Sequence, residues 1–378
     1  MIYLDHAATT PVPKAVADAM YTVLTEQYAN PNAQYPFGQE IRRSVEDWRA
    51  VIAKAVGCEA NQLFFTSCGT EGDNWAIRAA CWQNRHVGRH IVTTAVEHHA
   101  VLNCCQQLEQ EGWEVTTILP DQNGDISAEA VLSAVRPDTA LVSVMMVNNE
   151  LGSIYPIADI AKGLKAVNEK TLLHTDAVQG FLKVPFSAKA LGADFIAISG
   201  HKVGAPKGIG ALFVRDSQRQ TLHPPYVGGH QERGMRPGTE NTPYIVGLGL
   251  AAAKGAQRLR TKGDHLHALN RQLRTGLAEL PGITLNSPDD AVDEVVNFST
   301  GCINSQTFIN YLNTRAVYVS GGSACDKGEP SHTLLAMGCA DLTVRTALRV
   351  SFCADNTAED VDALLAGLRD GLQELQHI

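Results

Sequence analysis

Five polar clusters in this sequence each follow a short apolar run, and together they carry the side chains of a reactive site. Cys68-Gly69-Thr70-Glu71 follows "QLFFTS", and Glu97-His98-His99 follows "HIVTTAV". Three more runs lead to Asn148-Asn149-Glu150, Asp176-Ala177-Val178-Gln179 and Gly200-His201-Lys202. The five clusters supply a primary amine, carboxylates, amides, imidazoles and the start of a helix.

Each cluster also has an ordinary structural explanation when it is taken alone. Thr70 and Asp176 could cap helices. His98 could be a surface histidine and Lys202 a solvated loop cation. These explanations do not account for five clusters at five strand ends, where ligands bind in an open α/β sheet. We therefore expect one site that binds a phosphate and an aromatic ring and contains a reactive amine.

Catalysis by pyridoxal phosphate (PLP) requires these parts. A lysine forms a Schiff base with the cofactor's aldehyde, a carboxylate keeps the pyridine nitrogen protonated, and a cup of hydrogen-bond donors binds the phosphate. Lys202 fits the amine and Asp176 fits the carboxylate. The remaining candidates are Gly69, Thr70, Ser199 and His201 for the phosphate, His98 for the ring face, and Asn149 and Gln179 for the ring oxygen.

The intervening sequence predicts the elements that position these clusters. Residues 40–56 place apolar side chains at three- and four-residue steps, which indicates an amphipathic helix. Short apolar strands are expected at residues 62–67, 90–96, 140–149, 171–179, 194–200 and 210–214. Because helical patterns separate several of these strands, we expect an α/β fold with a mostly parallel sheet covered on both faces.

The last third of the chain has a different pattern. It begins with a long charged helix at residues 258–279. Strands in "GITLN", "EVVNFST" and "AVYVSGGS" surround a helical stretch at 305–313, and residues 357–376 form a closing amphipathic helix. This pattern predicts a separate α+β domain whose boundary lies near residues 255–262.

Cys325 is a further candidate, and it lies in "VYVSGGSACDKGEPSH". Lone cysteines usually pack in cores, but the glycine, serine and charged neighbours of this one predict an exposed thiol on a mobile loop. Such a thiol is suited to act as a nucleophile or sulfur carrier. The chain has nine cysteines and no C-x-x-C pair, so we expect no disulfide framework and no metal site.

Composition limits the remaining possibilities. A net charge of −9 argues against nucleic acid as a general partner. No apolar stretch is long enough to span a bilayer, and the first residues lack a secretory pattern. We therefore expect a cytoplasmic protein with reduced thiols. No G-x-G-x-x-G follows an early strand with an acidic residue downstream, which argues against a dinucleotide-dependent hydride-transfer enzyme.

A set of motifs resembles the cysteine desulfurases, the PLP-dependent group that supplies sulfur for iron–sulfur clusters and thiolated tRNA. These motifs run in order from residue 3 to residue 325: "YLDHAATTP", "TSCGTEGDN", "EHHAVL", "VNNELG", "HTDAVQ", "SGHKVGAPKGIGALFVR", "GGHQERGMRPGT" and "SGGSAC". The resemblance implies a PLP-dependent transferase of fold type I. Residues 16–258 would form a large domain with a mostly parallel seven-stranded sheet, and residues 1–15 and 259–378 a smaller α+β domain.

The resemblance also implies roles for single residues. Lys202 would hold the cofactor and act as a base, with His98 beside the ring, and Cys325 would become a persulfide. Arg349, in "ALRVSF", would clamp the substrate carboxylate, and the alternative for it is a surface ion pair. The remaining implied residues are Asp176, Asn149 and Gln179 at the ring, Thr70, Ser199 and His201 at the phosphate, Asn30 at the substrate, and Thr239 at the phosphate of the other subunit in a homodimer.

The implied reaction removes sulfur from L-cysteine, leaves L-alanine, and passes the sulfur to acceptor proteins of iron–sulfur or tRNA-thiolation pathways. A selenocysteine lyase or cysteine β-lyase on the same scaffold is an alternative, and a non-catalytic partner-binding protein is a more distant one. The sequence departs from the family pattern at four places. Tyr35 replaces a histidine, Cys68 replaces a glycine, the segment after Cys325 is short, and Cys353-Ala354 replaces Gly-Arg.

Overall fold

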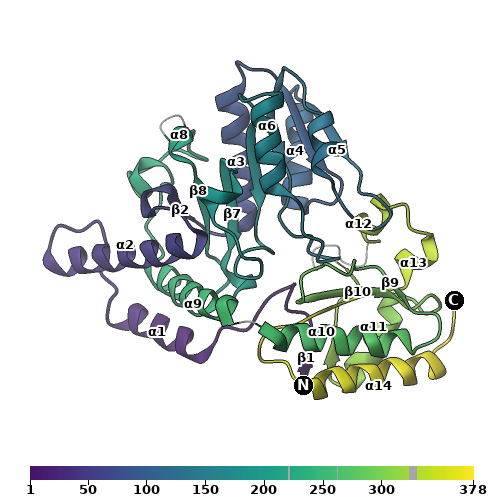
Figure 1. Cartoon of the computed structure of the whole chain (residues 1–378). Coiled ribbons are helices and arrows are strands. Elements are labelled where there is room, and N and C mark those ends of the chain that lie inside the picture. The colour runs from purple at the N-terminus through teal and green to yellow at the C-terminus, as the bar shows by residue number, and fades with distance from the viewer. Residues whose placement is uncertain (220–221, 262, 323–329) are drawn as a thin grey trace.

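The computed structural model describes residues 1–219, 222–261, 263–322 and 330–378. The described chain forms a large lobe around a seven-stranded sheet and a smaller lobe that contains the C-terminus (Figure 1). Within the described residues, no helix is both long enough and apolar enough to cross a bilayer.

The sheet of the large lobe is mostly parallel. Its strand order is β2-β8-β7-β6-β5-β3-β4, and only β8 runs antiparallel to its neighbours β2 and β7. The strands are β2 (Leu63–Thr66), β3 (His90–Thr94), β4 (Glu114–Ile118), β5 (Thr139–Ser143), β6 (Leu172–Asp176), β7 (Phe195–Ser199) and β8 (Gly210–Val214). The predicted α/β class with a mostly parallel sheet is confirmed.

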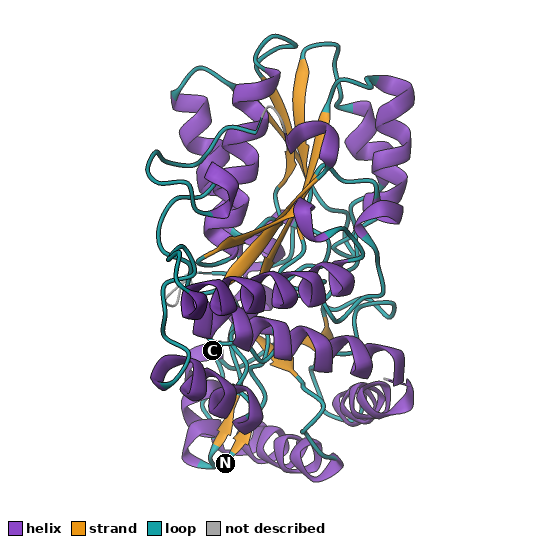
Figure 2. Cartoon of the chain, turned by 90° about the vertical axis from the view of Figure 1, so that its left-hand side faces the viewer, coloured by secondary structure: helices purple, strands orange, loops and turns teal. Residues whose placement is uncertain are grey.

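Helices cover both faces of this sheet (Figure 2). Alternate residues of β7 enter different cores: Phe195 and Ala197 pack on one face, and Ile196 and Ile198 pack on the other. Because both faces of the sheet are buried, its strands have continuous apolar sequences. The helices of the lobe are α1 (Lys14–Thr25), α2 (Pro36–Val56), α3 (Gly69–Asn84), α4 (His99–Gln110), α5 (Ala128–Ser133), α6 (Ile157–Val167), α7 (Ala188–Leu191), α8 (Asp216–Arg219) and α9 (Thr242–Thr261).

The small lobe has its own hydrophobic core, which includes Leu4 from the N-terminus. Strand β1 (Ile2–Tyr3) pairs in parallel with β11 (Val317–Tyr318), so the first residues belong to this lobe. The central strand β10 pairs antiparallel with both β9 and β12. The remaining elements are α10 (Gly263–Ala278), β9 (Thr284–Leu285), β10 (Val295–Ser299), α11 (Ser305–Thr314), α12 (His332–Ala336), α13 (Asp341–Arg345), β12 (Ala347–Ser351) and α14 (Ala358–Glu374).

Two expectations about elements were wrong, and one strand was not expected. The strand expected at 140–149 ends at Ser143, and residues 144–149 are buried but irregular. The helix expected at 258–279 is two helices, because α9 runs to Thr261 and α10 begins at Gly263. Strand β4 was not expected, since this edge strand is partly exposed and lacks a continuous apolar run. The domain boundary at residue 258 stays a prediction, and the structure places that residue in the last turn of α9.

Candidate active site

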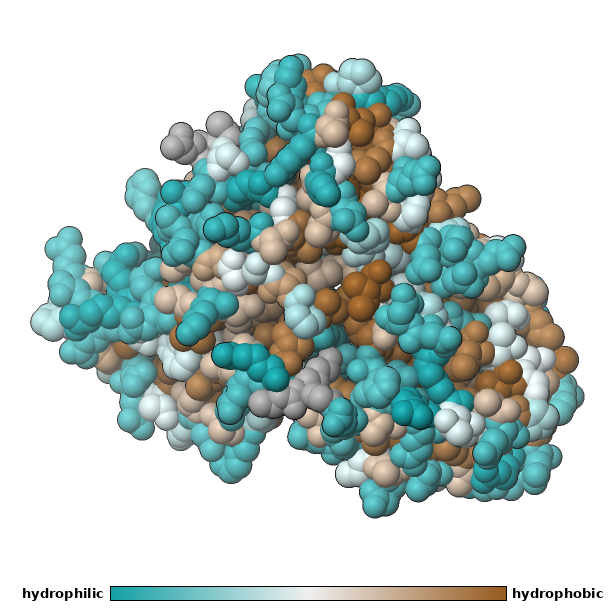
Figure 3. Space-filling view, viewed as in Figure 1, coloured by the Kyte–Doolittle hydropathy of each residue, from teal (hydrophilic) through white to brown (hydrophobic). Residues whose placement is uncertain are grey.

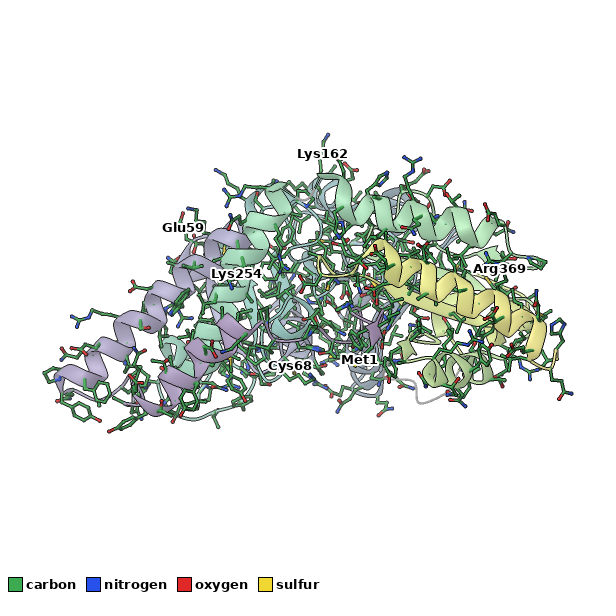
Figure 4. All side chains as sticks on the ribbon, turned by 90° about the horizontal axis from the view of Figure 1, so that it is seen from below. Met1, Glu59, Cys68, Lys162, Lys254 and Arg369 are labelled. Atoms are coloured by element: carbon green, nitrogen blue, oxygen red, sulfur yellow. The ribbon has the colours of Figure 1, made fainter. Side chains whose placement is uncertain are left out.

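One cavity of about 200 Å³ lies where the polar clusters converge at the strand ends. Its walls come from the exits of five strands, from the N-terminal segment, and from β12 of the small lobe. Viewed from below, Cys68 at the start of α3 lies near the middle of the molecule, whereas Lys162 and Arg369 project outward (Figure 4). The lining residues that the sequence predicted are Gly69, Thr70, His98, Asn149, Asp176, Gln179, Ser199, His201, Lys202 and Arg349.

A second cavity, of about 430 Å³, lies where the two lobes meet and shares Lys202 with the first. Figure 3 shows apolar side chains gathered along the junction between the lobes. Leu182, Leu259 and Phe352 line this second cavity, and so does Cys353, one of the departures from the family pattern. We assign the chemistry to the smaller cavity, because the clusters at the strand ends converge there.

Lys202 ends the short helical turn Gly200–Lys202 that follows β7 directly. A Cβ at Gly200 would lie 2.9 Å from the Cβ of Ala205, so only glycine fits this tight exit from the strand. The Lys202 Nζ donates hydrogen bonds to the carbonyl oxygens of Ala7 and Ala8, at 2.6 and 2.8 Å. The amine is therefore held at the cavity wall rather than in solvent.

Asp176 is the last residue of β6, and its side chain is buried. Its Oδ1 accepts a hydrogen bond from the Val178 backbone N–H at 2.8 Å. Burial raises the pKa of Asp176 to about 6, and this hydrogen bond and the charge of Lys202 oppose the rise. A cation placed against Asp176 would restore its ionised form, because an opposite charge lowers a carboxyl pKa.

The first turn of α3 forms an anion cup. Cys68 is the N-cap residue of this helix, with an extended backbone and no side-chain capping bond, and Cys68, Gly69 and Thr70 line the cavity. The positive end of the helix dipole favours a phosphate there. Ser199 and His201 line the same cavity, and a Cβ built on Gly69 would lie 3.5 Å from the Cβ of Ser199. Burial, followed by the charge of Lys202, lowers the pKa of His201 to about 4, so this imidazole is neutral at pH 7.

The side chains around the middle of the cavity suit a hydroxylated aromatic ring. His98 caps α4, and its Nδ1 accepts a hydrogen bond from the Ala100 N–H, which fixes the imidazole. Gln179 Nε2 donates to the Ala7 carbonyl at 2.9 Å. Asn149 Oδ1 is buried and has no hydrogen-bond partner in the described part of the chain. An orphaned acceptor at this place fits the hydroxyl group of PLP, so the residues present fit that cofactor.

Arg349 reaches this cavity from β12 and is 1% exposed, so it does not form a surface ion pair. Its Nη2 lies 2.7 Å from Asp5 Oδ1, and its Nη1 donates to the Asn149 carbonyl at 2.9 Å. The Nε atom is buried and has no hydrogen-bond partner among the described residues. The Nε side of the guanidinium is therefore available to an incoming carboxylate.

Two predicted residues are not brought to this cavity, and a third is not among the described residues. Asn30 and Thr239 are exposed and are absent from its lining. Cys325 lies outside the described residues, whose nearest members are Gly322 and Pro330. Tyr35, which replaces the family histidine, is 55% exposed at the start of α2.

Asp73 is a lining residue that sequence reasoning missed. It is 1% exposed and lies on α3, three residues after Thr70. Residues three apart share one face of a helix, and that spacing is the signal that could have identified it. The polar clusters at the strand ends do not include this carboxylate, which lies about one helical turn further along.

A family model, curated proteins and solved structures all match this chain over most of its length. A family model described as aminotransferase class-V matches residues 2–364. The chain is 40% identical to the cysteine desulfurase IscS of Methanosarcina thermophila, over 100% of this chain and 93% of that protein. Its fold matches a NifS-like protein with a TM-score of 0.93, at 35% identity over 99% of this chain and 100% of the other. It also matches a structure described as SspA in complex with cysteine, with a TM-score of 0.81 at 34% identity over 93% and 99% of the two chains.

Proposed function

This chain belongs to the class-V aminotransferase family and is a PLP-dependent cysteine desulfurase, and from that premise we propose which residues perform its chemistry. The observation that supports the assignment is the convergence of Lys202, Asp176 and Arg349 on one cavity. An amine, a buried acid and a guanidinium there match the three charged functions that a PLP site for amino acids requires.

Lys202, Asp176 and the cup on α3 would hold the cofactor. When bound, PLP supplies an electron sink that stabilises negative charge at the substrate Cα. Asp176 would keep a proton at the pyridine nitrogen, and the amides around Gly69 and Thr70 would bind the phosphate. Lys202 would hold the cofactor, and its Nζ would serve as the base for the proton at the substrate Cα. His98 would contact the ring.

Arg349 would bind the α-carboxylate of L-cysteine through its Nε and the remaining Nη2 proton. A planar guanidinium matches a carboxylate with two parallel hydrogen bonds. Asp5 and the Asn149 carbonyl fix the other donors of Arg349, so the group is oriented before the substrate arrives. Arg349 and Lys202 line the same cavity, so a substrate bound by Arg349 would be held beside Lys202. Asn30 would contribute to the substrate entrance.

Cys325 would accept the sulfur. Its thiolate attacks the Sγ of the bound cysteine, the Sγ–Cβ bond breaks with its electron pair going to Cβ, and protonation of Cβ gives L-alanine. The sulfur remains on Cys325 as a persulfide. Cys325 is three residues after Gly322, and three residues of extended chain reach about 10 Å. A Cβ built on Gly322 would lie 3.4 Å from a carboxylate oxygen of Glu150, which follows Asn149 in the chain. Gly322 is therefore close to a neighbour of the cavity, and a reach of about 10 Å from it supports the role proposed for Cys325.

We further propose a homodimer in which Thr239 binds the phosphate at the partner's site. Thr239 is exposed and away from its own cavity, which supports this assignment. Tyr21, Leu24 and Tyr28, on or just after α1, are 56–71% exposed in the arm that α1 and α2 form (Figure 1), and a partner would cover them. A sedimentation measurement that finds only monomers would contradict this proposal.

The persulfide would pass to an acceptor protein of an iron–sulfur or tRNA-thiolation pathway. A reducing compartment such as the cytoplasm suits this chemistry, because a persulfide on an exposed thiol is easily oxidised. The eight cysteines in the described part of the chain are free thiols, which supports such a compartment.

The Cys325→Ala variant tests the assignment against a lyase on the same scaffold. We expect it to lose sulfide release from L-cysteine in the presence of a reductant while the bound cofactor keeps its visible absorbance. Cys353→Ala is the matched control and should release sulfide at the parent rate. A Cys325→Ala protein that still releases sulfide at the parent rate would show that the enzyme is a lyase.

A further inference from the structure

A buried acidic group lies beside the cofactor cavity and has no part in the chemistry above. Asp73 on α3 is 1% exposed and lines the cavity. Its Oδ1 lies 3.4 Å from the Nε2 of His174. Both atoms are buried, and neither has a hydrogen-bond partner among the residues that the structure describes. Two orphaned polar atoms at this distance are a short movement from a hydrogen bond, provided that one of them carries a proton.

His174 connects this pair to Asp176. It precedes Asp176 by two residues on β6, so the two side chains leave the same face of the sheet. Its other nitrogen, Nδ1, lies 2.9 Å from Ser143 Oγ on the neighbouring strand β5. Asp73, His174 and Ser143 therefore form a buried row that crosses from α3 to the sheet on the side of Asp176.

The environment of this row favours neutral side chains. Burial raises the pKa of Asp73 well above its usual value, and the charges of Asp176, Glu97 and Cys68 add to the rise. Burial lowers the pKa of His174 to about 3. The other ionisable side chains that line this cavity are Cys68, His98, His201, Lys202 and Arg349, and the charge of Lys202 acts on Asp176. An ionised Asp73 would also place a second negative charge beside Asp176 in a dry pocket.

We propose that Asp73 is a positioning residue that stays protonated and donates a hydrogen bond from its carboxyl O–H to His174 Nε2. Asp176 is then left as the ionised acid that would face the cofactor nitrogen. His174 then donates from Nδ1 to Ser143 Oγ, so both orphaned atoms, Asp73 Oδ1 and His174 Nε2, have a partner. Asp73 touches neither the cofactor nitrogen nor the substrate in this assignment. It acts through the charge and orientation of Asp176, so the inference rests on the role proposed for Asp176.

The variants Asp73→Asn and Asp73→Leu test whether Asp73 acts as a protonated acid or as an ionised carboxylate. The amide of asparagine donates a hydrogen bond and carries no charge, so Asp73→Asn should keep PLP affinity within about threefold of the parent. Leucine fills the space without a donor, and Asp73→Leu should weaken PLP binding by at least about tenfold, the effect expected for an orphaned buried acceptor. The pH at which the bound cofactor changes its visible absorbance should stay at the parent value in Asp73→Asn and shift in Asp73→Leu.

Two results would overturn the inference. If Asp73→Asn loses as much PLP affinity as Asp73→Leu, then Asp73 acts as a carboxylate. If both variants bind PLP like the parent, then Asp73 has no positioning role. Should Asp73→Leu fail to fold by circular dichroism, the folded Asp73→Asn still decides whether a charge is required. Asp176→Asn is measured alongside, and unchanged PLP binding in that variant would contradict the role proposed for Asp176, the premise of this inference, whatever the Asp73 variants show.

Discussion

Single side chains at this site are arranged by burial and by their partners. Arg349 is the clearest case, because a buried guanidinium with one unpartnered nitrogen is costly unless a ligand uses it. Asp5 neutralises part of its charge at 2.7 Å, and the substrate carboxylate would complete the set. Replacing the guanidinium of Arg349 should therefore weaken substrate binding more than cofactor binding.

Arg349→Lys should raise KM for L-cysteine by roughly 10- to 100-fold, because a lysine cannot make two parallel hydrogen bonds to a carboxylate. Cofactor affinity should remain near the parent value. Steady-state sulfide release and PLP titration together measure the two effects. Arg345→Lys is the matched control, since Arg345 is exposed and forms an ion pair with the exposed Asp341. An unchanged KM in Arg349→Lys would remove Arg349 from the substrate site.

Glu97 should make the cofactor-free protein less stable as the pH rises. Burial raises the pKa of Glu97 to about 8. A carboxyl with a raised folded-state pKa contributes stability that is present below its unfolded pKa and is lost as the pH rises through the folded value. His174, whose pKa is lowered to about 3, has the opposite effect only below about pH 6.5. Between pH 6.5 and 8 the contribution of Glu97 should therefore decline by about 1.4 kcal/mol per pH unit.

Denaturant unfolding of the parent and of Glu97→Gln at several pH values measures this effect. Glutamine keeps an oxygen to accept the bonds from Thr94 Oγ1 and the Met145 N–H, so the fold is retained. The difference in unfolding free energy between the two proteins should change with pH across this window. A difference that stays constant with pH would mean that Glu97 is ionised in the folded protein.

Helix α3 and strand β6 bring the phosphate cup and the ring acid to one cavity, and Gly69 sets their spacing. A Cβ on Gly69 would lie 2.7 Å from Val178 Cγ2. The backbone N–H of Val178 also holds the carboxylate of Asp176. Pressure on Val178 would therefore move the acid as well as the first turn of the helix.

Gly69→Ala should weaken PLP affinity by roughly tenfold, since overpacking at such a contact costs about 1–3 kcal/mol. The double variant Gly69→Ala/Val178→Ala should recover much of the loss, because the clashing methyl group is removed. Cofactor titration by absorbance measures both variants, and Val178→Ala alone is the control. If the double variant binds PLP no better than Gly69→Ala, the contact with Val178 is not the cause.

Sequence patterns predicted the buried strands of the sheet but not the irregular or exposed segments. The apolar runs at β6 and β7 identified buried strands, and their polar ends identified Asp176 and Lys202, because a sheet buried on both faces has an unmistakable pattern. Residues 144–149 were misread as strand because burial alone gives the same apolar composition. The exposed edge strand β4 was missed for the opposite reason.

Contacts between residues that are far apart in the sequence could not be predicted from these patterns. Arg349 meets Asp5 across more than 300 residues, and no local pattern records that pair. Asp73 and His174 are likewise brought together by the packing of α3 on β6, not by their spacing in the chain. Such pairs depend on tertiary packing, which the periodicity of single elements does not encode.

In the proposed function, sulfur passes from the substrate in the cofactor cavity to Cys325, which follows β11 in the sequence. Mass spectrometry of the purified holoenzyme after incubation with L-cysteine and without reductant tests this transfer most directly. We expect a peptide that contains Cys325 to gain the mass of one sulfur atom, and the gain to disappear on reduction. A gain on another cysteine, or none while alanine accumulates, would contradict the transfer to Cys325.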